Sequence, residues 1–380
     1  MEMQSKTILS ALLLAVAFDL NLLGGSLHKV WELNLKEAMQ NSGGGVSGRP
    51  GVTALRFSPD GSRIALGTEG YHSVTDALIR LMVVDVEHPS NRIQQFKIGG
   101  IASDSELLGD RPPAIAWSPA GDLVLAGSDL VRIQDGSICR IPGGMGDGFL
   151  GPGGIVVFAL HDSGAPSRLD LFDSNCRLSG SWEPEGEWIP GSVSSERGFV
   201  SALRKTGRRG ILPEELLVVD PVARKVIRSW PTAQTGYASR FADHGKVLCA
   251  GYSGPDAFDE TVVPPRCMDV DSGEKIAEAR GIIGGFPFSA AEDASRIIAS
   301  DRRASWNFLF RENDNVLRRR VVWDFRRGSE VASWRPETQS YNLPGLIPPV
   351  KESFVFAISP DGQYVAEGGN DILRLYKIEP

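Results

Sequence analysis

The sequence predicts an all-β fold, a single β-propeller, most simply with seven blades of four antiparallel strands each. The first observation is a repeated sequence motif. In it, an apolar strand ends in an Asp, which is followed by a polar turn and a second strand. The repeated residues are Asp85, Asp173, Asp220, Asp269 and Asp324. The first and last are 239 residues apart. With Asp135 in a degenerate unit, the period is about 48 residues, which is typical of propeller blades.

A second motif, a Ser-Pro-x-Gly turn, alternates with the first. It occurs at residues 57–61, 117–121 and 358–362. Pro presets φ for a turn, Asp hydrogen-bonds to its own turn, and Gly accepts a positive φ. A content of 43 Gly and 24 Pro in 380 residues suits a chain with many tight turns.

Each blade is expected to hold four short strands with turn residues between them. For blades one to three these are 53–57, 63–67, 79–85 and 92–98; 114–117, 123–126, 130–133 and 137–141; and 148–150, 155–159, 168–172 and 177–182. For blades four to six they are 188–193, 199–203, 215–220 and 225–230; 237–241, 246–250, 266–270 and 275–279; and 286–289, 296–299, 319–325 and 330–334.

The last blade contains only three strands before the chain ends, at 354–358, 364–367 and 372–378. An open sheet edge favours aggregation. Residues 27–35 form an alternating apolar strand near the other end of the chain, and we expect them to supply the fourth strand and close the ring. Six blades remain the alternative if blade two or three is not a full sheet.

Three outer strands end in Ser-Trp, at Trp182, Trp230 and Trp334. A large aromatic side chain at one place in successive blades is expected to pack between neighbouring sheets. We therefore interpret these residues as structural.

These two motifs resemble the WD40 and WD40-like β-propeller repeats. Trp323-Asp324 is a literal Trp-Asp dipeptide at the end of a third strand, and the other repeated Asp occupy its equivalent. The Gly-His dipeptide of that repeat is absent from every blade, so its His-centred hydrogen-bond network is not expected. The resemblance implies a divergent propeller with a scaffolding or binding role, although a fold alone does not specify function.

Residues 1–25 differ from the expected propeller at 26–380. An apolar run at 8–18 follows Lys6 and includes Ala15-Val16-Ala17. Its length and its A-x-A site are typical of a signal peptide, which predicts export to the periplasm or the exterior. The alternative is an apolar helix packed on a cytoplasmic domain. No segment has the length of a stable membrane span.

The net charge of −7 argues against nucleic acid as a partner. The four cysteines, Cys139, Cys176, Cys249 and Cys267, form no C-x-x-C motif. Cys249 and Cys267 fall on adjacent strands of one blade and could form a disulfide. Buried free thiols are the alternative.

No catalytic residue, cofactor or metal site is predicted. The five His lack metal-ligand spacing. A G-x-G-x-x-G match at 146–151 lacks the following helix of a phosphate-binding loop. We interpret it as a plain loop.

The main charge anomaly lies in blade six, where residues 301–335 hold nine Arg against five carboxylates. Arg interleaved with aromatic residues can form a face for an anionic ligand or a protein. The alternative is that Arg on an exposed strand discourages edge pairing. The candidate partner-binding residues are Arg302, Arg303, Trp306, Phe308, Phe310 and Arg311.

The sequence thus favours a monomeric, non-catalytic propeller that binds a protein or peptide. The alternative is a propeller enzyme, a lactonase-like hydrolase or a quinoprotein-like protein, with its site at the central channel.

Overall fold

The computed structural model describes most of the chain outside residues 1–25. The described residues are 26–41, 50–70, 79–90, 93–99, 115–142, 146–151, 154–160, 166–205, 214–235, 238–251, 264–280, 282, 287–301, 319–334, 355–369 and 371–379. The expected leader at 1–25 lies outside them.

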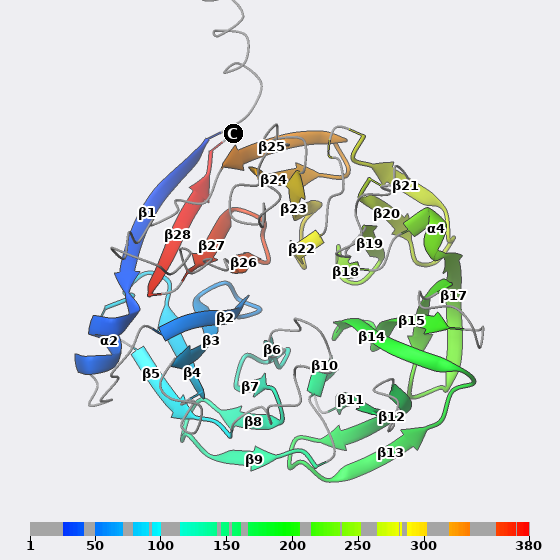
Figure 1. Ribbon diagram of the computed structural model, residues 1–380, viewed down its shortest axis with the longest axis horizontal. Coiled ribbons are helices and arrows are strands. Elements are labelled where there is room, and N and C mark those ends of the chain that lie inside the picture. The colour runs from blue at the N-terminus through cyan, green and yellow to red at the C-terminus, as the bar shows by residue number, and fades with distance from the viewer. Residues whose placement is uncertain are drawn as a thin grey trace, which may run out of the picture.

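Seven four-stranded antiparallel sheets form a ring, which confirms the predicted seven-bladed propeller (Figure 1). Blade one contains β2 (Pro50–Phe57), β3 (Arg63–Gly70), β4 (Ile79–Asp85) and β5 (Ile93–Lys97). Blade two contains β6 (Ile115–Trp117), β7 (Leu123–Ala126), β8 (Asp129–Arg132) and β9 (Ile138–Arg140). Blade three contains β10 (Gly146–Leu150), β11 (Gly154–Leu160), β12 (Pro166–Asp173) and β13 (Leu178–Trp182).

The next three blades keep the same order from the first, innermost strand to the fourth, outermost strand. Blade four contains β14 (Glu187–Ser194), β15 (Phe199–Lys205), β16 (Glu215–Asp220) and β17 (Lys225–Pro231). Blade five contains β18 (Ala238–Ala242), β19 (Val247–Gly251), β20 (Arg266–Asp269) and β21 (Lys275–Glu278). Blade six contains β22 (Pro287–Ala290), β23 (Arg296–Asp301), β24 (Arg319–Asp324) and β25 (Ser329–Trp334).

Blade seven joins the two ends of the chain, as predicted. Its inner strands are β26 (Val355–Ile358), β27 (Tyr364–Gly368) and β28 (Ile372–Ile378), and β1 (Leu27–Asn34) is its outermost strand. β1 pairs antiparallel with β28 from Leu27 opposite Ile378 to Asn34 opposite Ile372. Two short helices, α2 (Leu35–Asn41) and α4 (Thr232–Thr235), were not expected from the repeat.

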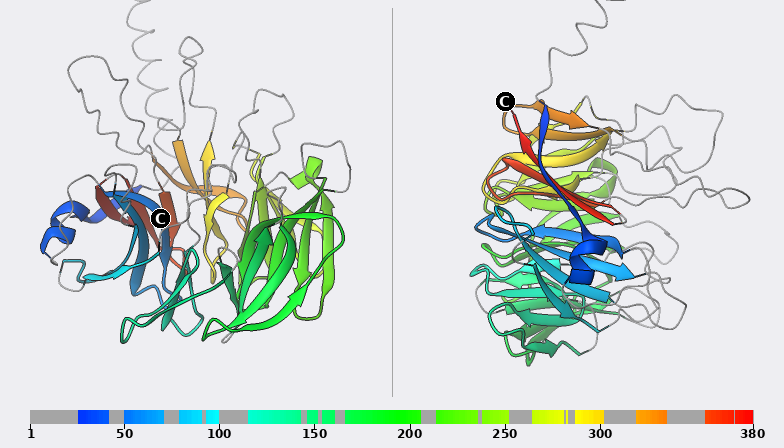
Figure 2. Two further views of the ribbon diagram at one scale, coloured as in Figure 1. Left: turned by 60° about the horizontal axis from the view of Figure 1, so that its bottom comes forward. Right: turned by 90° about the vertical axis from the view of Figure 1, so that its left-hand side faces the viewer.

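The antiparallel order gives the ring two different faces. Turns from first to second and from third to fourth strands lie on one face, which we call the turn face. Connections from second to third strands and between blades leave from the opposite face, the connection face (Figure 2). The longest stretches between strands, such as 302–318 and 335–354, start and end at strand ends on the connection face.

The core lies between the blades, because each sheet buries apolar residues on both sides. One cluster joins Leu81 and Val83 of blade one to Trp117 and Val124 of blade two. Another joins blades two and three through residues that include Leu130 and Phe172. Face-to-face packing of neighbouring sheets therefore supplies the apolar burial that holds the ring together.

The Ser-Pro-x-Gly turns have a common geometry. Gly61, Gly121 and Gly362 have φ of 71°, 70° and 71°. The preceding Ser is buried in all three turns, and in the first, the Ser58 hydroxyl donates to Asp60 Oδ1 at 2.6 Å and accepts from the Arg63 N–H at 2.9 Å. The Ser is thus the hydrogen-bonding centre of the turn.

The plain-loop interpretation of 146–151 was wrong and the strand expected at 148–150 is confirmed, because residues 146–150 form β10, the first strand of blade three. A Cβ at Gly148 would lie 2.7 Å from Val193 Cβ in blade four, so the absent side chain permits close approach of two inner strands.

All four cysteines form disulfides. Cys249 pairs with Cys267 within blade five, one of the two arrangements the sequence allowed. Cys139 pairs with Cys176 between blades two and three, a pairing that sequence spacing did not single out. In the part of the chain that the structure describes, no helix has the length and apolar character needed to cross a membrane.

Candidate functional site

The six candidate partner-binding residues lie outside the described residues. They belong to the stretch between Asp301, the last residue of β23, and Arg319, the first residue of β24. Both strand ends are on the connection face. The assignment of Arg302, Arg303, Trp306, Phe308, Phe310 and Arg311 to a binding surface remains a prediction.

The repeated Asp residues lie at the ends of third strands and hydrogen-bond to the turns that follow. Asp324 Oδ1 accepts the N–H groups of Arg326 and Arg327, both at 3.0 Å. Asp85, Asp173, Asp220 and Asp269 likewise accept backbone N–H groups of their own turns, at 2.7–3.0 Å. These hydrogen bonds lower the pKa of Asp173. The carboxylates therefore stabilise turns at the rim and do not converge on one site.

The outer-strand Trp residues contact the next blade. The Trp230 indole N–H donates to Gly273 O of blade five at 3.0 Å, and that of Trp334 donates to Glu367 Oε2 of blade seven at 3.0 Å. Trp182 meets Trp188 of blade four edge to face at 5.4 Å between ring centroids. In β1, the Trp31 indole N–H donates to Val86 O of blade one at 2.8 Å.

An ion pair on the third strand recurs around the ring, and the sequence reasoning missed it. The pairs of blades two to seven are Arg140–Asp129, Arg168–Asp170, Arg204–Glu215, Arg266–Glu278, Arg319–Glu330 and Arg374–Glu32. Blade one has a neutral version, in which Arg80 Nη1 donates to Gln95 Oε1 at 3.0 Å. A spacing of 11 residues between the partners in blades two, four and six was the available sequence signal.

The ion pair of blade seven contains the most buried Arg of the series and extends into a network. The Arg374 guanidinium, 5% exposed, donates to Glu32 Oε2 of β1 at 2.9 Å and to Glu367 Oε1 at 3.0 Å. Burial alone would lower the pKa of Arg374, but the two carboxylate partners raise it overall. The same guanidinium lowers the pKa of Glu32. A charged network therefore joins the N-terminal strand to the last blade.

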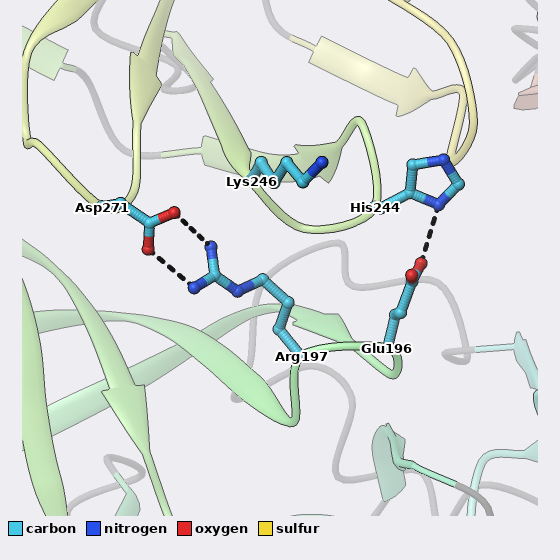
Figure 3. Close-up of a pocket in the computed structure, with 5 residues that line it drawn as sticks. All are labelled: Glu196, Arg197, His244, Lys246 and Asp271. Carbon is cyan, nitrogen blue, oxygen red and sulfur yellow. Dashed lines mark hydrogen bonds and ion pairs between the residues drawn. The ribbon is translucent and has the colours of Figure 1, made fainter.

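A pocket of about 390 Å³ opens on the turn face between blades four and five (Figure 3). Glu196 and Arg197 come from the β14–β15 turn, His244 and Lys246 from the β18–β19 turn, and Asp271 from the β20–β21 turn. Because each turn is short and carries its own hydrogen bonds, the framework of the pocket is set by the strands behind it.

An ion pair between blades forms one wall of the pocket. Arg197 Nη1 and Nη2 donate to the two oxygens of Asp271 at 3.1 and 2.7 Å, a bidentate contact (Figure 3). The contact lowers the pKa of Asp271. Bidentate geometry sets the orientation of the guanidinium relative to the carboxylate.

His244 forms the opposite wall and contacts two other blades. Its Nδ1 lies 2.8 Å from Glu196 Oε2 in blade four and 3.5 Å from Asp293 Oδ1 in blade six. Asp243 and His244 have φ of 48° and 56°, a left-handed conformation that L-residues rarely adopt. These contacts come from other blades, so the spacing of the histidines in the sequence does not indicate them.

The lining can bind charged groups. Two carboxylates and two cations surround the hollow, and in the described part of the chain Lys246 makes no ion pair. Across the described ranges, no group of three or more His, Cys, Asp or Glu side chains is placed to hold a metal ion. The pocket therefore offers groups of both charges to a polar ligand.

Comparisons with known proteins address the fold. No protein-family model and no curated protein matches the chain. Among solved structures, the chain is similar to one from a crystal structure of the mitotic checkpoint complex, with 10% identity, a TM-score of 0.56, and coverage of 93% of this chain and 95% of that chain. It is also similar to hydrazine synthase of Kuenenia stuttgartiensis, with 12% identity, a TM-score of 0.58, and coverage of 88% and 98%. At these identities the likeness supports the WD40-like propeller fold and nothing further about activity.

Proposed function

We propose that this protein is a non-catalytic, exported propeller that binds a protein or peptide partner on its connection face. The observation that carries the proposal is the asymmetry of the ring. Strands on the turn face are joined by short, hydrogen-bonded turns, whereas every long stretch between strands departs from the connection face. Variable loops held by a rigid scaffold are where binding residues concentrate.

Contacts between turns support this assignment of the two faces. Arg63 donates to Gly121 O of blade two at 2.6 Å, and Arg296 donates to Gly362 O of blade seven at 2.7 Å. The Gly151 N–H donates to Ser195 O of blade four at 2.7 Å. Much of the turn face is thus engaged in holding the blades together.

The composition of one long stretch on the connection face indicates what kind of partner would bind there. The stretch between β23 and β24 is rich in Arg and aromatic residues, which are enriched at protein interfaces. The proposed partner therefore presents carboxylates beside apolar side chains.

Export is supported by the cysteines, because all four are oxidised in two disulfides. Disulfides persist in oxidising compartments and are rare in the cytosol. N-terminal sequencing of the native protein tests this part, and an intact Met1 in a cytosolic fraction would contradict it.

Site-specific photo-crosslinking tests the binding face. A photoreactive residue at Phe308 should give a discrete crosslinked species in native cells, and one at Gln363, exposed on the turn face, should not. Replacing Arg302, Arg303 and Arg311 by Ala should abolish the Phe308 product. Equal products from both positions, or a Phe308 product that survives the Arg replacements, would refute the proposal.

A further inference from the structure

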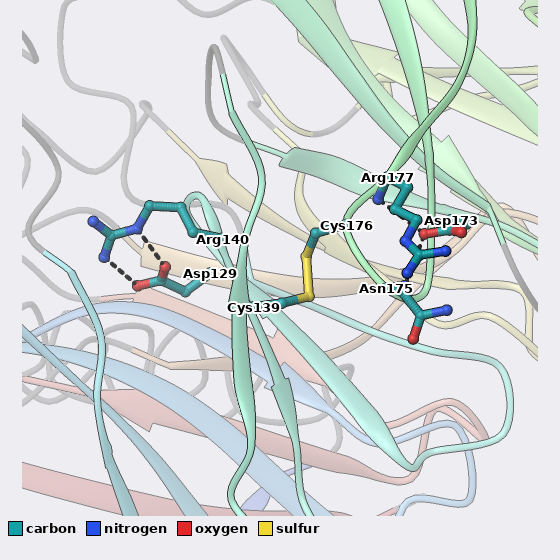
Figure 4. The surroundings of a disulfide bond; sticks show 7 residues. All are labelled: Asp129, Cys139, Arg140, Asp173, Asn175, Cys176 and Arg177. Atoms are coloured by element: carbon teal, nitrogen blue, oxygen red, sulfur yellow. Dashed lines mark hydrogen bonds and ion pairs between the residues drawn. A yellow bond between two sulfur atoms is a disulfide. The ribbon is translucent and has the colours of Figure 1, made fainter.

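The two disulfides lie in different surroundings. Cys249 and Cys267 face each other on β19 and β20, and both are 0% exposed. Cys139, on the outermost strand β9, and Cys176, in the β12–β13 turn, are only half-buried, and we call their bond the rim disulfide (Figure 4). A dithiol in solution therefore has access to the second pair and not to the first.

The rim disulfide occupies the position of a recurrent contact between blades. Trp230 lies opposite Leu216, the second residue of β16, and bonds to Gly273 in the following blade. Cys139 lies opposite Leu130, the second residue of β8, and bonds to Cys176 in the following blade. In both cases an outer strand is joined to the third turn of the next blade.

The turn residue supports the same equivalence. Gly273 and Cys176 both have positive φ, 81° and 59°. This region favours glycine, and a side chain there costs about 1 kcal/mol or more. A cysteine in a position suited to glycine is explained by the bond that it makes to Cys139.

Blade two depends on this bond more than other blades would. Its strands contain only three, four, four and three residues, and β9 has no tryptophan. Among the described residues, an apolar cluster that includes Ile141, Phe149 and Phe172 also spans this interface. Loss of the disulfide would therefore loosen the interface of blades two and three without dispersing its core.

We infer that Cys139–Cys176 is a thiol–disulfide exchange site through which a dithiol controls the interface of blades two and three. A thiolate of the dithiol attacks one Sγ, forms a mixed disulfide and releases the other cysteine as a thiolate. The second thiol of the dithiol then closes its own disulfide and releases the remaining cysteine. Two electrons pass to the protein, and the two thiolates take up the protons that the dithiol loses.

Differential alkylation tests the inference on the intact, folded protein. After brief treatment with dithiothreitol, Cys139 and Cys176 should react with iodoacetamide at least about tenfold faster than Cys249 and Cys267, because a buried pair reacts only through local opening. The positions are read by mass spectrometry. Equal rates for the two pairs, or no labelling before global unfolding, would overturn it.

The structural consequence needs a second measurement. Dithiothreitol should lower the melting temperature of the wild type to that of the C139S/C176S variant and leave that variant unchanged. The C249S/C267S variant should keep the full dithiothreitol response. If the C139S/C176S variant still responds, or if the wild type does not, the rim disulfide is not the controlling site.

Discussion

Replacing Arg374 by Met should destabilise the ring more than any exposed ion-pair substitution, because Arg374 is the buried centre of the network that joins β1 to blade seven. Glu367 is 1% exposed and would lose its guanidinium partner while keeping the Trp334 indole N–H. Removing one member of a buried pair typically costs about 3–5 kcal/mol. Met retains most of the apolar volume, so the loss is chiefly electrostatic.

Two matched variants separate the contributions of Glu32 and Glu367 to the stability of this network. Glu32→Gln removes the partner whose side chain is 40% exposed and should cost only about 0.5–1 kcal/mol, since solvent screens it. Replacing Arg374 and Glu367 together by Met leaves no unpaired buried charge, because Glu32 is 40% exposed and keeps Lys29 as a partner. Such double replacements are often neutral or better than the single change.

Urea unfolding followed by tryptophan fluorescence and by circular dichroism measures these free energies. We expect the order of stability to be wild type, then Glu32→Gln, then the double Met variant, then Arg374→Met. A cost below about 1 kcal/mol for Arg374→Met, or a double variant no more stable than the single one, would refute the argument that an unpaired buried charge dominates.

Two further predictions concern the closure of the ring by β1. Deleting residues 27–35 should abolish cooperative folding, because blade seven loses its outermost strand, and a synthetic peptide of that sequence added in trans should restore it; an unchanged melting profile would contradict ring closure. The pKa of Glu32 is lowered in the folded protein, so its contribution is present above the ordinary value of 4.5 and is lost as pH falls through the folded value. Stability measured from pH 6 to pH 3 should therefore fall less steeply in the Glu32→Gln variant than in the wild type, and identical slopes would disprove a role for this group.

The fold was predictable because its determinants are local. The repeated Asp before each turn, the Ser-Pro-x-Gly turns and alternating apolar residues each act within one strand pair. The lack of a fourth strand in the last blade then required a donor, and β1 is that donor. The loop interpretation of 146–151 was wrong, because the close approach of Gly148 to Val193 is a property of two blades rather than of one segment.

The candidate site was much less predictable for the same reason. Arg197 and Asp271 are 74 residues apart, and His244 meets Glu196 and Asp293 from different blades. Such contacts arise from the position of each blade in the ring and leave no periodic mark in the sequence. The rim disulfide belongs to this class too, since Cys139 and Cys176 share no motif.

The pairing of β1 with β28 also dictates the order of folding events. Glu32 and Arg374 form an ion pair although they are separated by 342 residues. At about 5–20 residues per second, ribosomal synthesis would deliver β28 roughly 20–70 s after β1. Leu33 and Leu35 pack in a cluster that joins blade one to Leu373 and Leu375 of β28, so this cluster stays incomplete during that interval. β1 is synthesised first and its pairing partner β28 last. A nascent chain that lacks β28 therefore cannot reach the native state. A chaperone that covers β1 would act during this interval.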